Sequence, residues 1–317
     1  MPGARASART ARVVLILAAV ALTYSAPPPQ APVFVSVLVY EPMADVEQLI
    51  ENFLKFTESE TRLLVHLNAL QNYSHADVDT LEHSGRVLVN PERLAVVWGS
   101  PQISAAFLSN ADLAASTLTA NQIEAAIVVW VDSNMFWTRP CMEQYVRVHE
   151  CTNYDRNVGL FPAGKPKNAA TMAATRNGST FSYNDHEGAF FRLTTLLNLH
   201  KEAFPLGYFG GLFHYPENWL FPSFGSHRGC TGGRLCRWAK NTGGAASQAL
   251  HSPRPNEFSY KRVPRSLEVI AGISGTTVDG SRAGHSRPIN ATAAAALRQL
   301  FLDLQPPANH TCQTPRT

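Results

Sequence analysis

Apolar residues along the first half of the chain fall into short runs that alternate with amphipathic stretches. Four of these runs predict buried strands: residues 33–40, 62–68, 86–90 and 124–131. Between them, apolar side chains recur at helical spacing over residues 45–56, 77–82 and 104–116. Strands and helices that alternate in this way predict parallel pairing with right-handed crossovers. We therefore expect an α/β fold with a Rossmann-like, mostly parallel sheet flanked by helices.

The second half of the chain is less regular. Residues 153–182 and 225–248 are rich in Gly and polar residues and predict long loops. Residues 187–200 and 292–304 carry amphipathic helical patterns, and residues 258–263 predict an edge strand. No internal repeat marks a second copy of any unit, so we expect one domain over residues 33–305, followed by a tail over 306–317.

The N-terminus has the composition of a secretory signal. Arg5, Arg9 and Arg12 precede the apolar run 13–22, which small residues and three prolines follow. Residues 1–26 are thus expected to be a signal peptide or a short signal-anchor, with 27–32 as a proline-rich linker. The run is shorter than the ~20 residues of a membrane span, which favours cleavage. We expect the protein to enter the secretory pathway and to contact a membrane only through the N-terminal segment, if that segment is an anchor.

Composition excludes two classes of protein. Apolar residues make up 45% and charged residues 16%, which suits a globular core and argues against a disordered chain. The formal net charge of +3 is too small for a dedicated nucleic-acid binder, so no nucleic-acid partner is expected.

Two sequence features suit an oxidising compartment. Glycosylation sequons begin at Asn72, Asn177, Asn290 and Asn309. The spacings of Cys141 with Cys151 and of Cys230 with Cys236 permit two local disulfides. Cys312 is then either free or paired between chains. A zinc site is disfavoured because no C-x-x-C motif occurs.

Polar residues follow the predicted strands at the edge where α/β sheets bind ligands. They are Glu41, Asn68, Asn90, Asp132, Ser133 and Asn134. Such groups could bind the base, ribose and sugar hydroxyls of a nucleotide-sugar, although Asn and Asp also favour turns in any protein. The chain has no G-x-G-x-x-G and no Walker lysine motif, which disfavours NAD and ATP.

No metal or other cofactor is expected. Asp77-Val78-Asp79 matches the D-x-D pattern of many sugar-transferring enzymes but lies in a connector, and Asp132-x-Asn134 supplies one carboxylate. Without a metal, protein cations must stabilise a diphosphate leaving group. The candidates are Lys261, Arg262 and Arg265. The alternative is a solvated patch on an edge strand.

Sugar transfer with inversion needs a general base, usually Asp or Glu. Glu217 is the candidate, because the aromatic residues Tyr215 and Trp219 flank it and could contact an acceptor sugar. Its alternative role is a helix N-terminal charge. Glu187 and Asp185 are secondary candidates, Glu187 as an acceptor-binding residue.

Five runs resemble, in order, the core-2/I-branching β-1,6-N-acetylglucosaminyltransferase-like glycosyltransferases over about residues 35–265. They read SVLVYEPMADVEQLIENFLKF, VHLN, NPERLAVVWGSPQISAAFLSN, VDSNMFW and PENWLFPSF. The resemblance implies a GT-A type fold with an irregular C-terminal acceptor-side half, a UDP-sugar donor, inversion, no metal and a Golgi or secreted location. Trp98 and Gly99 match the tryptophan-glycine pair of that family, and the basic segment matches loosely.

Two positions depart from that family. Asn68 stands where the family has Asp, and Asn218 stands where it has its catalytic Glu. The leading hypothesis is a glycosyltransferase that moves a sugar from a nucleotide-sugar to a glycan or glycoprotein hydroxyl. In it, Glu217 is the base, and the donor contacts are Asn68, Trp98, Asp132, Asn134, Lys261, Arg262 and Arg265. The alternatives are a carbohydrate-binding protein that keeps the fold without catalysis, and a hydrolase that pairs Asp185 with Glu217.

Overall fold

The computed structural model describes residues 30–97, 100–153, 187–203, 221, 230–238, 258–261, 303 and 305–306. The side chains of residues 202–203, 236–238 and 260–261 lie outside that description. The chain divides into two units, Met1–Ala31 and Pro32–Thr317, and every element below belongs to the second. No helix in the described part is both long enough and apolar enough to cross a membrane.

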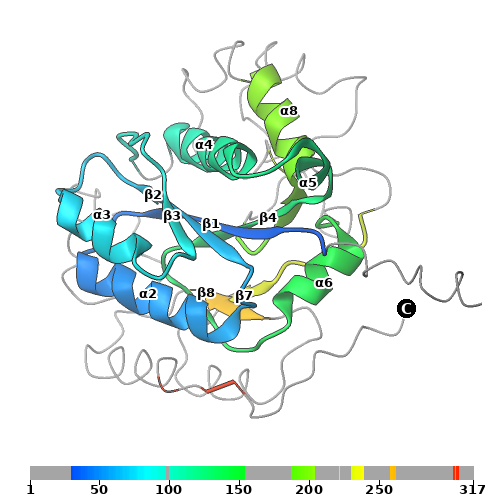
Figure 1. Cartoon of the computed structure of the whole chain (residues 1–317), viewed down its shortest axis with the longest axis horizontal. Coiled ribbons are helices and arrows are strands. Elements are labelled where there is room, and N and C mark those ends of the chain that lie inside the picture. Colours follow the sequence, from blue (N-terminus) through cyan, green and yellow to red (C-terminus); the bar gives the residue numbers. More distant parts are fainter. Residues whose placement is uncertain are drawn as a thin grey trace, which may run out of the picture. The chain divides into compact units, whose positions relative to one another are not determined.

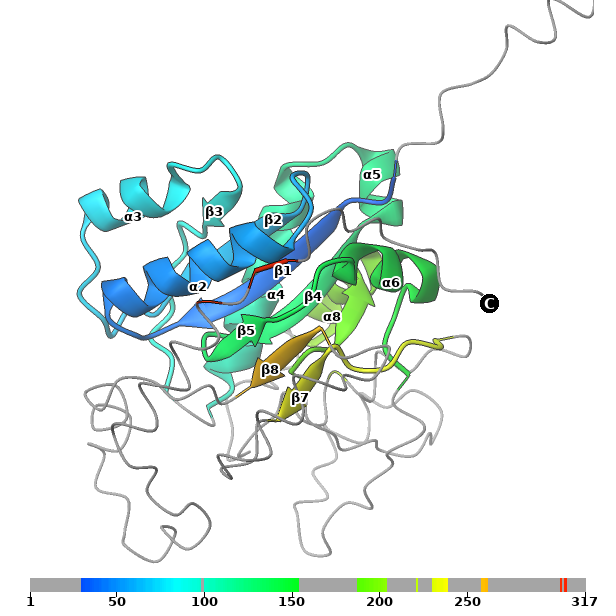
Figure 2. The same cartoon turned by 90° about the horizontal axis from the view of Figure 1, so that it is seen from below.

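The main sheet has five strands in the order β3-β2-β1-β4-β6, of which Figures 1 and 2 label β1 to β4. They are β1 (Val33–Val39), β2 (Arg62–Leu67), β3 (Val87–Val89), β4 (Ile127–Asp132) and β6 (Phe190–Arg192). The first four pair in parallel, and β6 runs antiparallel to β4. The predicted α/β fold with a mostly parallel sheet is confirmed, and the order β3-β2-β1-β4 is that of a Rossmann-type half.

Helices cover both faces of this sheet (Figures 1 and 2). One face carries α2 (Met43–Phe56) and α3 (His75–Glu82), and the other carries α4 (Gln102–Ser116), α5 (Ala120–Ala125) and α8 (Leu193–Ala203). The alternation of strand side chains separates the two cores. Val35 packs in the cluster that contains α2, whereas Phe34 packs in the cluster that contains α4 and α8. Each such buried side chain contributes about 1.5–3 kcal/mol to folding.

A second, three-stranded sheet has the order β5-β8-β7. Its strands are β5 (Met135–Trp137), β7 (Cys236–Trp238) and β8 (Ser259–Lys261), and α6 (Met142–His149) follows β5. Asn52 of α2 fixes β5, because its Nδ2 donates to Trp137 O (3.0 Å) and its Oδ1 accepts from Trp137 N (2.6 Å). The predicted edge strand is therefore wrong in one respect: β8 is paired on both sides, antiparallel to β5 and parallel to β7.

The helix predicted over residues 187–200 is a strand followed by a helix. Phe190–Arg192 pairs with β4, and α8 begins at Leu193. Phe190 and Phe191 point to opposite faces and enter the two different cores, as the period of a strand requires. The elements α5, α6, β5 and β7 were not predicted from the sequence.

Candidate functional site

The carboxyl ends of β1 and β4 lie side by side at the switch point of the sheet. The chain continues from β1 to β2 and β3 on one side, whereas β4 lies on the other side of β1. Ligands of open α/β sheets bind at such a point. Ser133 Oγ, just after β4, donates to Oε1 of Glu41, just after β1, at 2.5 Å. Both residues are buried, at 8% and 3% exposure.

The backbone around Glu41 is fixed from a third segment. The hydroxyl of Tyr73, in the connection between β2 and α3, donates to Glu41 O at 2.6 Å. Burial, and then the negative charge of Glu41, raises the pKa of Tyr73 far above its ordinary value. The hydroxyl is therefore a permanent donor at physiological pH. The N–H of Tyr40 also donates to Glu41 Oε2 (3.0 Å).

The segment Asp132-Ser133-Asn134 forms the turn between β4 and β5. Across this turn, Asp132 N–H donates to Met135 Sδ at 3.2 Å. Asn134 Oδ1 is buried and accepts no hydrogen bond from the described residues. A buried acceptor of this kind is rare in folded proteins. Within the described part of the chain, this oxygen is therefore an acceptor that remains available.

The basic segment begins beside this turn. Lys261 of β8 pairs with Met135 of β5 in the antiparallel ladder, so the Lys261 backbone lies next to the end of the Asp132–Asn134 turn. The pairing thus brings the start of the basic segment close to the Asp132–Asn134 turn, from which it is far apart in the sequence. The Lys261 side chain lies outside the described part, as do Arg262 and Arg265.

Glu187 comes to the same rim. It directly precedes Gly188, whose N–H donates to Trp130 O of β4 at 2.9 Å. Glu187 is 7% exposed. Because β6 runs antiparallel to β4, the residues before β6 lie at the carboxyl end of β4. The structure therefore assembles Glu41, Ser133, Asp132, Asn134 and Glu187 around one edge.

The side chain of Asn68 forms hydrogen bonds with the protein backbone. Its Oδ1 accepts from Val96 N (2.9 Å) and Leu70 N (3.1 Å), and its Nδ2 donates to Val96 O (2.7 Å). This two-way pairing fixes the segment that leads to Trp98 and Gly99, which lie outside the described residues. Asn68 thereby holds the β3–α4 connection against the end of β2, and its contact with a nucleotide stays a prediction.

A buried polar network beneath α4 was not recognised in the sequence. Asn90, which follows β3, donates from Nδ2 to Ser109 Oγ (3.0 Å) and Asn110 Oδ1 (2.9 Å). Asn110 Nδ2 in turn donates to Ser36 Oγ of β1 (2.9 Å). Asn90 therefore also serves the fold. Two features of the sequence could have indicated this network: the polar pair Ser109-Asn110 on the buried side of a helix, and His66 within an apolar strand.

His66 connects this network to the β3–α4 connection. Its Nε2 accepts from Leu94 N–H (3.0 Å), so Nδ1 carries the proton and donates to Ser109 Oγ (3.3 Å). Burial, and then the charge of Arg93, lowers the pKa of His66 from 6.5 to about 4. His66 is therefore neutral at physiological pH and is a structural group.

Asp77, the first residue of the D-x-D match, belongs to a helix cap. Asp77 Oδ2 accepts from Ser74 N (2.6 Å) and Ser74 Oγ (2.9 Å), and Ser74 Oγ accepts from Asp77 N (3.2 Å). These bonds form the capping box that begins α3. The hydrogen bonds from Ser74 lower the pKa of Asp77. The Asp77 carboxylate is thus turned toward Ser74 at the N-terminus of α3. No group of three or more His, Cys, Asp or Glu side chains suited to a metal occurs in the described part.

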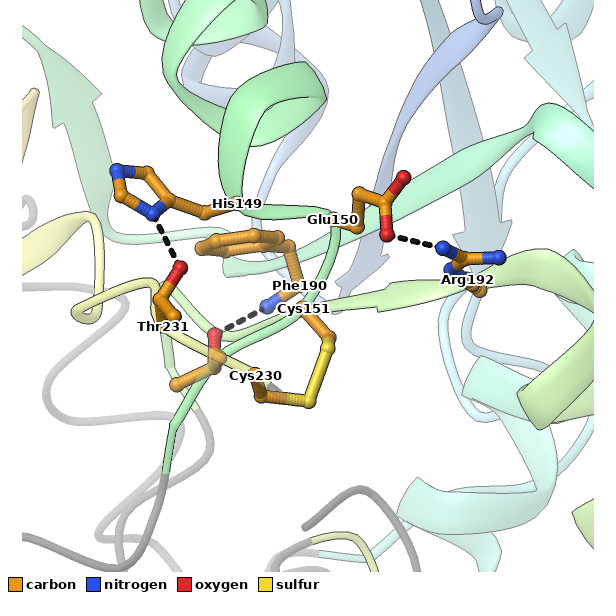
Figure 3. The surroundings of a disulfide bond; sticks show 8 residues. His149, Glu150, Cys151, Phe190, Arg192, Cys230 and Thr231 are labelled. Atoms are coloured by element: carbon orange, nitrogen blue, oxygen red, sulfur yellow. Dashed lines mark hydrogen bonds and ion pairs between the residues drawn. A yellow bond between two sulfur atoms is a disulfide. The ribbon is translucent and has the colours of Figure 1, made fainter. Parts of the chain in front are cut away.

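The disulfide pairing differs from the local one that the spacing permitted. Cys151 is bonded to Cys230, across a sequence separation of 79 residues (Figure 3). Cys141 is disulfide-bonded as well. The reason is tertiary, because β6 brings the segment after α6 and the segment before β7 together. Thr152 Oγ1 accepts from Phe190 N (2.9 Å), and His149 Nδ1 contacts Thr231 Oγ1 at 2.7 Å.

Several predicted residues lie outside the described part of the chain. They are Glu217, Tyr215, Trp219, Asp185, Asn218, Asn177, Asn290, Asn309 and the side chain of Cys236. Asn72 is described and is exposed, in the connection between β2 and α3.

No protein-family model matches the sequence, and no curated protein matches it. Solved structures resemble the chain at low identity. The structure of S. aureus TarS 1–349 is 12% identical, with a TM-score of 0.40, covering 86% of this chain and 71% of that one. The bifunctional glycosyltransferase WbbM is 12% identical (TM-score 0.39), covering 76% of this chain and 47% of that one, so the chain spans about half of WbbM.

A third similar structure is the mannosyltransferase PcManGT from Pyrobaculum calidifontis in complex with GDP-Man and Mn²⁺. It is 14% identical, with a TM-score of 0.35, covering 93% of this chain and 79% of that one. Likenesses of this size do not assign the chain to a family.

Proposed function

We propose that this protein is a glycosyltransferase that moves a sugar from a nucleotide-sugar, UDP-linked, to a hydroxyl of a glycan or glycoprotein. The proposal takes the fold to be of the GT-A type and the location to be the Golgi lumen or the cell exterior. One observation carries it. Segments that are remote in the sequence meet at the switch point of the sheet, where Glu41, Ser133 and Glu187 are buried.

The chemistry of this edge suits a sugar substrate. Carboxylates, a hydroxyl and an amide oxygen are the acceptors that sugar hydroxyl groups require, and burial strengthens each such hydrogen bond. In the proposal, Asp132 and Asn134 contact the donor. Lys261, Arg262 and Arg265 stabilise the departing diphosphate without a metal. The pairing of Lys261 with Met135 supports this role, since it begins the basic segment beside the Asp132–Asn134 turn.

A binding screen tests the nucleotide. Thermal unfolding is followed with UDP, GDP, CMP and their sugars, each with and without manganese. A ligand present at 100 times its Kd stabilises the native state by about 2.7 kcal/mol. A UDP-specific rise in Tm that manganese leaves unchanged is expected. If every nucleotide leaves the Tm unaltered at millimolar concentration, the proposed function is wrong.

A second candidate is a carbohydrate-binding protein that keeps the fold without turnover. The pairing of Asn68 with the Val96 backbone favours it, because a group at the expected donor site serves the chain instead. UDP binding without release of UDP from its sugars, over a broad set of acceptor glycans, identifies this candidate.

A further inference from the structure

Glu187 lies at an irregularity of the main sheet. The ladder between β4 and β6 is regular up to the pair Val129 and Phe190. Beyond it, Trp130 N–H donates to Ala189 O (2.8 Å), while Trp130 O accepts from Gly188 N–H (2.9 Å). Gly188 and Ala189, just before β6, therefore both face the single residue Trp130 of β4. Gly188 has φ 73°, so the arrangement is a bulge with glycine in the left-handed region.

This bulge places Glu187 at the end of β4. Trp130 is two residues before Asp132, and Gly188 is bonded to its carbonyl group, so Glu187 lies beside the last residues of the strand. Bulges of this type frequently re-aim a side chain next to an active site. Here the re-aimed residue is a carboxylate that is 7% exposed at the sheet edge where ligands bind.

The backbone of the bulge is also held from its other side. Gly188 O accepts from Leu235 N–H (2.8 Å), and Leu235 O accepts from Phe258 N (2.9 Å) and Ser259 N (3.0 Å). Five residues before Leu235, Cys230 is joined by a disulfide to Cys151, which follows α6 (Figure 3). The backbone next to Glu187 is thus held by β4 and by the segment that leads into β7, and a fixed backbone is the support that a catalytic group needs before substrate arrives.

We propose that Glu187 is the general base of the transfer reaction. The inference rests on the proposed function and makes it more specific. The acceptor hydroxyl oxygen forms a bond to the anomeric carbon of the donor sugar. The bond from that carbon to the phosphate oxygen breaks, and the nucleoside diphosphate leaves with the electron pair. The hydroxyl proton passes to the Glu187 carboxylate. Glu217, the base expected from the sequence, is the rival.

The test compares three variants: Glu187→Gln, Glu217→Gln and the control Glu150→Gln. Glu150 lies in the same region but is exposed, in an ion pair with Arg192. Release of nucleoside diphosphate is measured from UDP-N-acetylglucosamine, UDP-galactose, UDP-glucose and GDP-mannose, with mixed acceptor glycans. Loss of a general base lowers turnover by about 10²–10⁴-fold. We expect that loss for Glu187→Gln, with an unchanged Kd for the nucleotide, and no loss for Glu150→Gln.

The outcomes separate this inference from the function beneath it. If the wild-type chain releases no nucleotide from any donor, the proposed function and the inference both fail. If it does, and Glu187→Gln is as active as the wild type, only the inference fails. Should Glu187→Gln not fold, Glu187→Asp replaces it, because the shorter side chain retains the charge. A normal kcat in that variant overturns the inference, and a lowered kcat with normal nucleotide binding supports it.

Discussion

Ser133 and Glu41 are 92 residues apart in the sequence, yet a hydrogen bond of 2.5 Å joins their side chains across the switch point of the sheet. It couples the carboxyl ends of β1 and β4, the two strands that border the proposed site. The position of the Asp132–Asn134 turn therefore depends on a group that follows β1.

Ser133→Ala is expected to lower both stability and nucleotide affinity. The substitution removes a donor from a carboxylate that is 3% exposed, and loss of one partner of a buried hydrogen bond costs about 1–3 kcal/mol. Urea unfolding and the nucleotide Kd measure the two effects. The control is Ser59→Ala, which removes an exposed hydroxyl bonded to Glu60. If the two substitutions have equal effects, the Ser133–Glu41 hydrogen bond does not support the site in the way described.

Asn68→Asp is expected to destabilise the protein without raising its activity. The change restores the acid of the resembled family but removes the donor to Val96 O (2.7 Å) and places a charge at 3% exposure. A buried acceptor left without its donor costs about 1–3 kcal/mol, and more when the introduced group is charged. Denaturant unfolding and nucleotide binding are measured together. Tighter UDP binding in the variant would show that position 68 contacts the nucleotide.

Acidification is expected to reduce stability through His66. Its pKa is 6.5 in the unfolded chain and about 4 in the folded one, so below pH 6.5 the unfolded state binds a proton that the folded state does not. Stability is lost as the pH falls from about 6.5 to 4, by about 3 kcal/mol in total. The check is urea unfolding at several pH values. His66→Gln, which keeps an acceptor for Leu94 N–H, should flatten the profile in this window, and an unchanged slope contradicts the assignment.

Gly232→Ala is expected to disturb the region of the disulfide. An added Cβ would lie 2.2 Å from Phe190 Cζ and 2.9 Å from Cys151 O. Overpacking against buried groups costs about 1–3 kcal/mol. Gly85→Ala is the matched control, because it has φ 68° and nothing within 4 Å of its added Cβ, so it pays only for its backbone, about 1–2 kcal/mol. Calorimetric Tm values compare the two, and a smaller loss at Gly232 would count against the packing described.

The parallel part of the fold could be predicted from the order of residues alone. Each of the runs around Val35, Val65 and Val129 is apolar on both faces, and only a sheet covered by helices on both sides buries such runs. The edge where Glu41 and Asp132 gather follows from that topology alone. The pattern is local, and so it can be read from neighbouring residues.

Features that depend on contacts between remote segments could not be predicted in this way. The sequence around residues 190–192 has a helical pattern, yet these residues form a strand. The reason is that their backbone groups form hydrogen bonds with the edge of β4. The pairing of Cys151 with Cys230, the central place of β8, and the capture of Asn68 by Val96 have no local signal. The bulge at Gly188 likewise exists only where β6 meets β4, since a chain bends in this way to fit a partner strand.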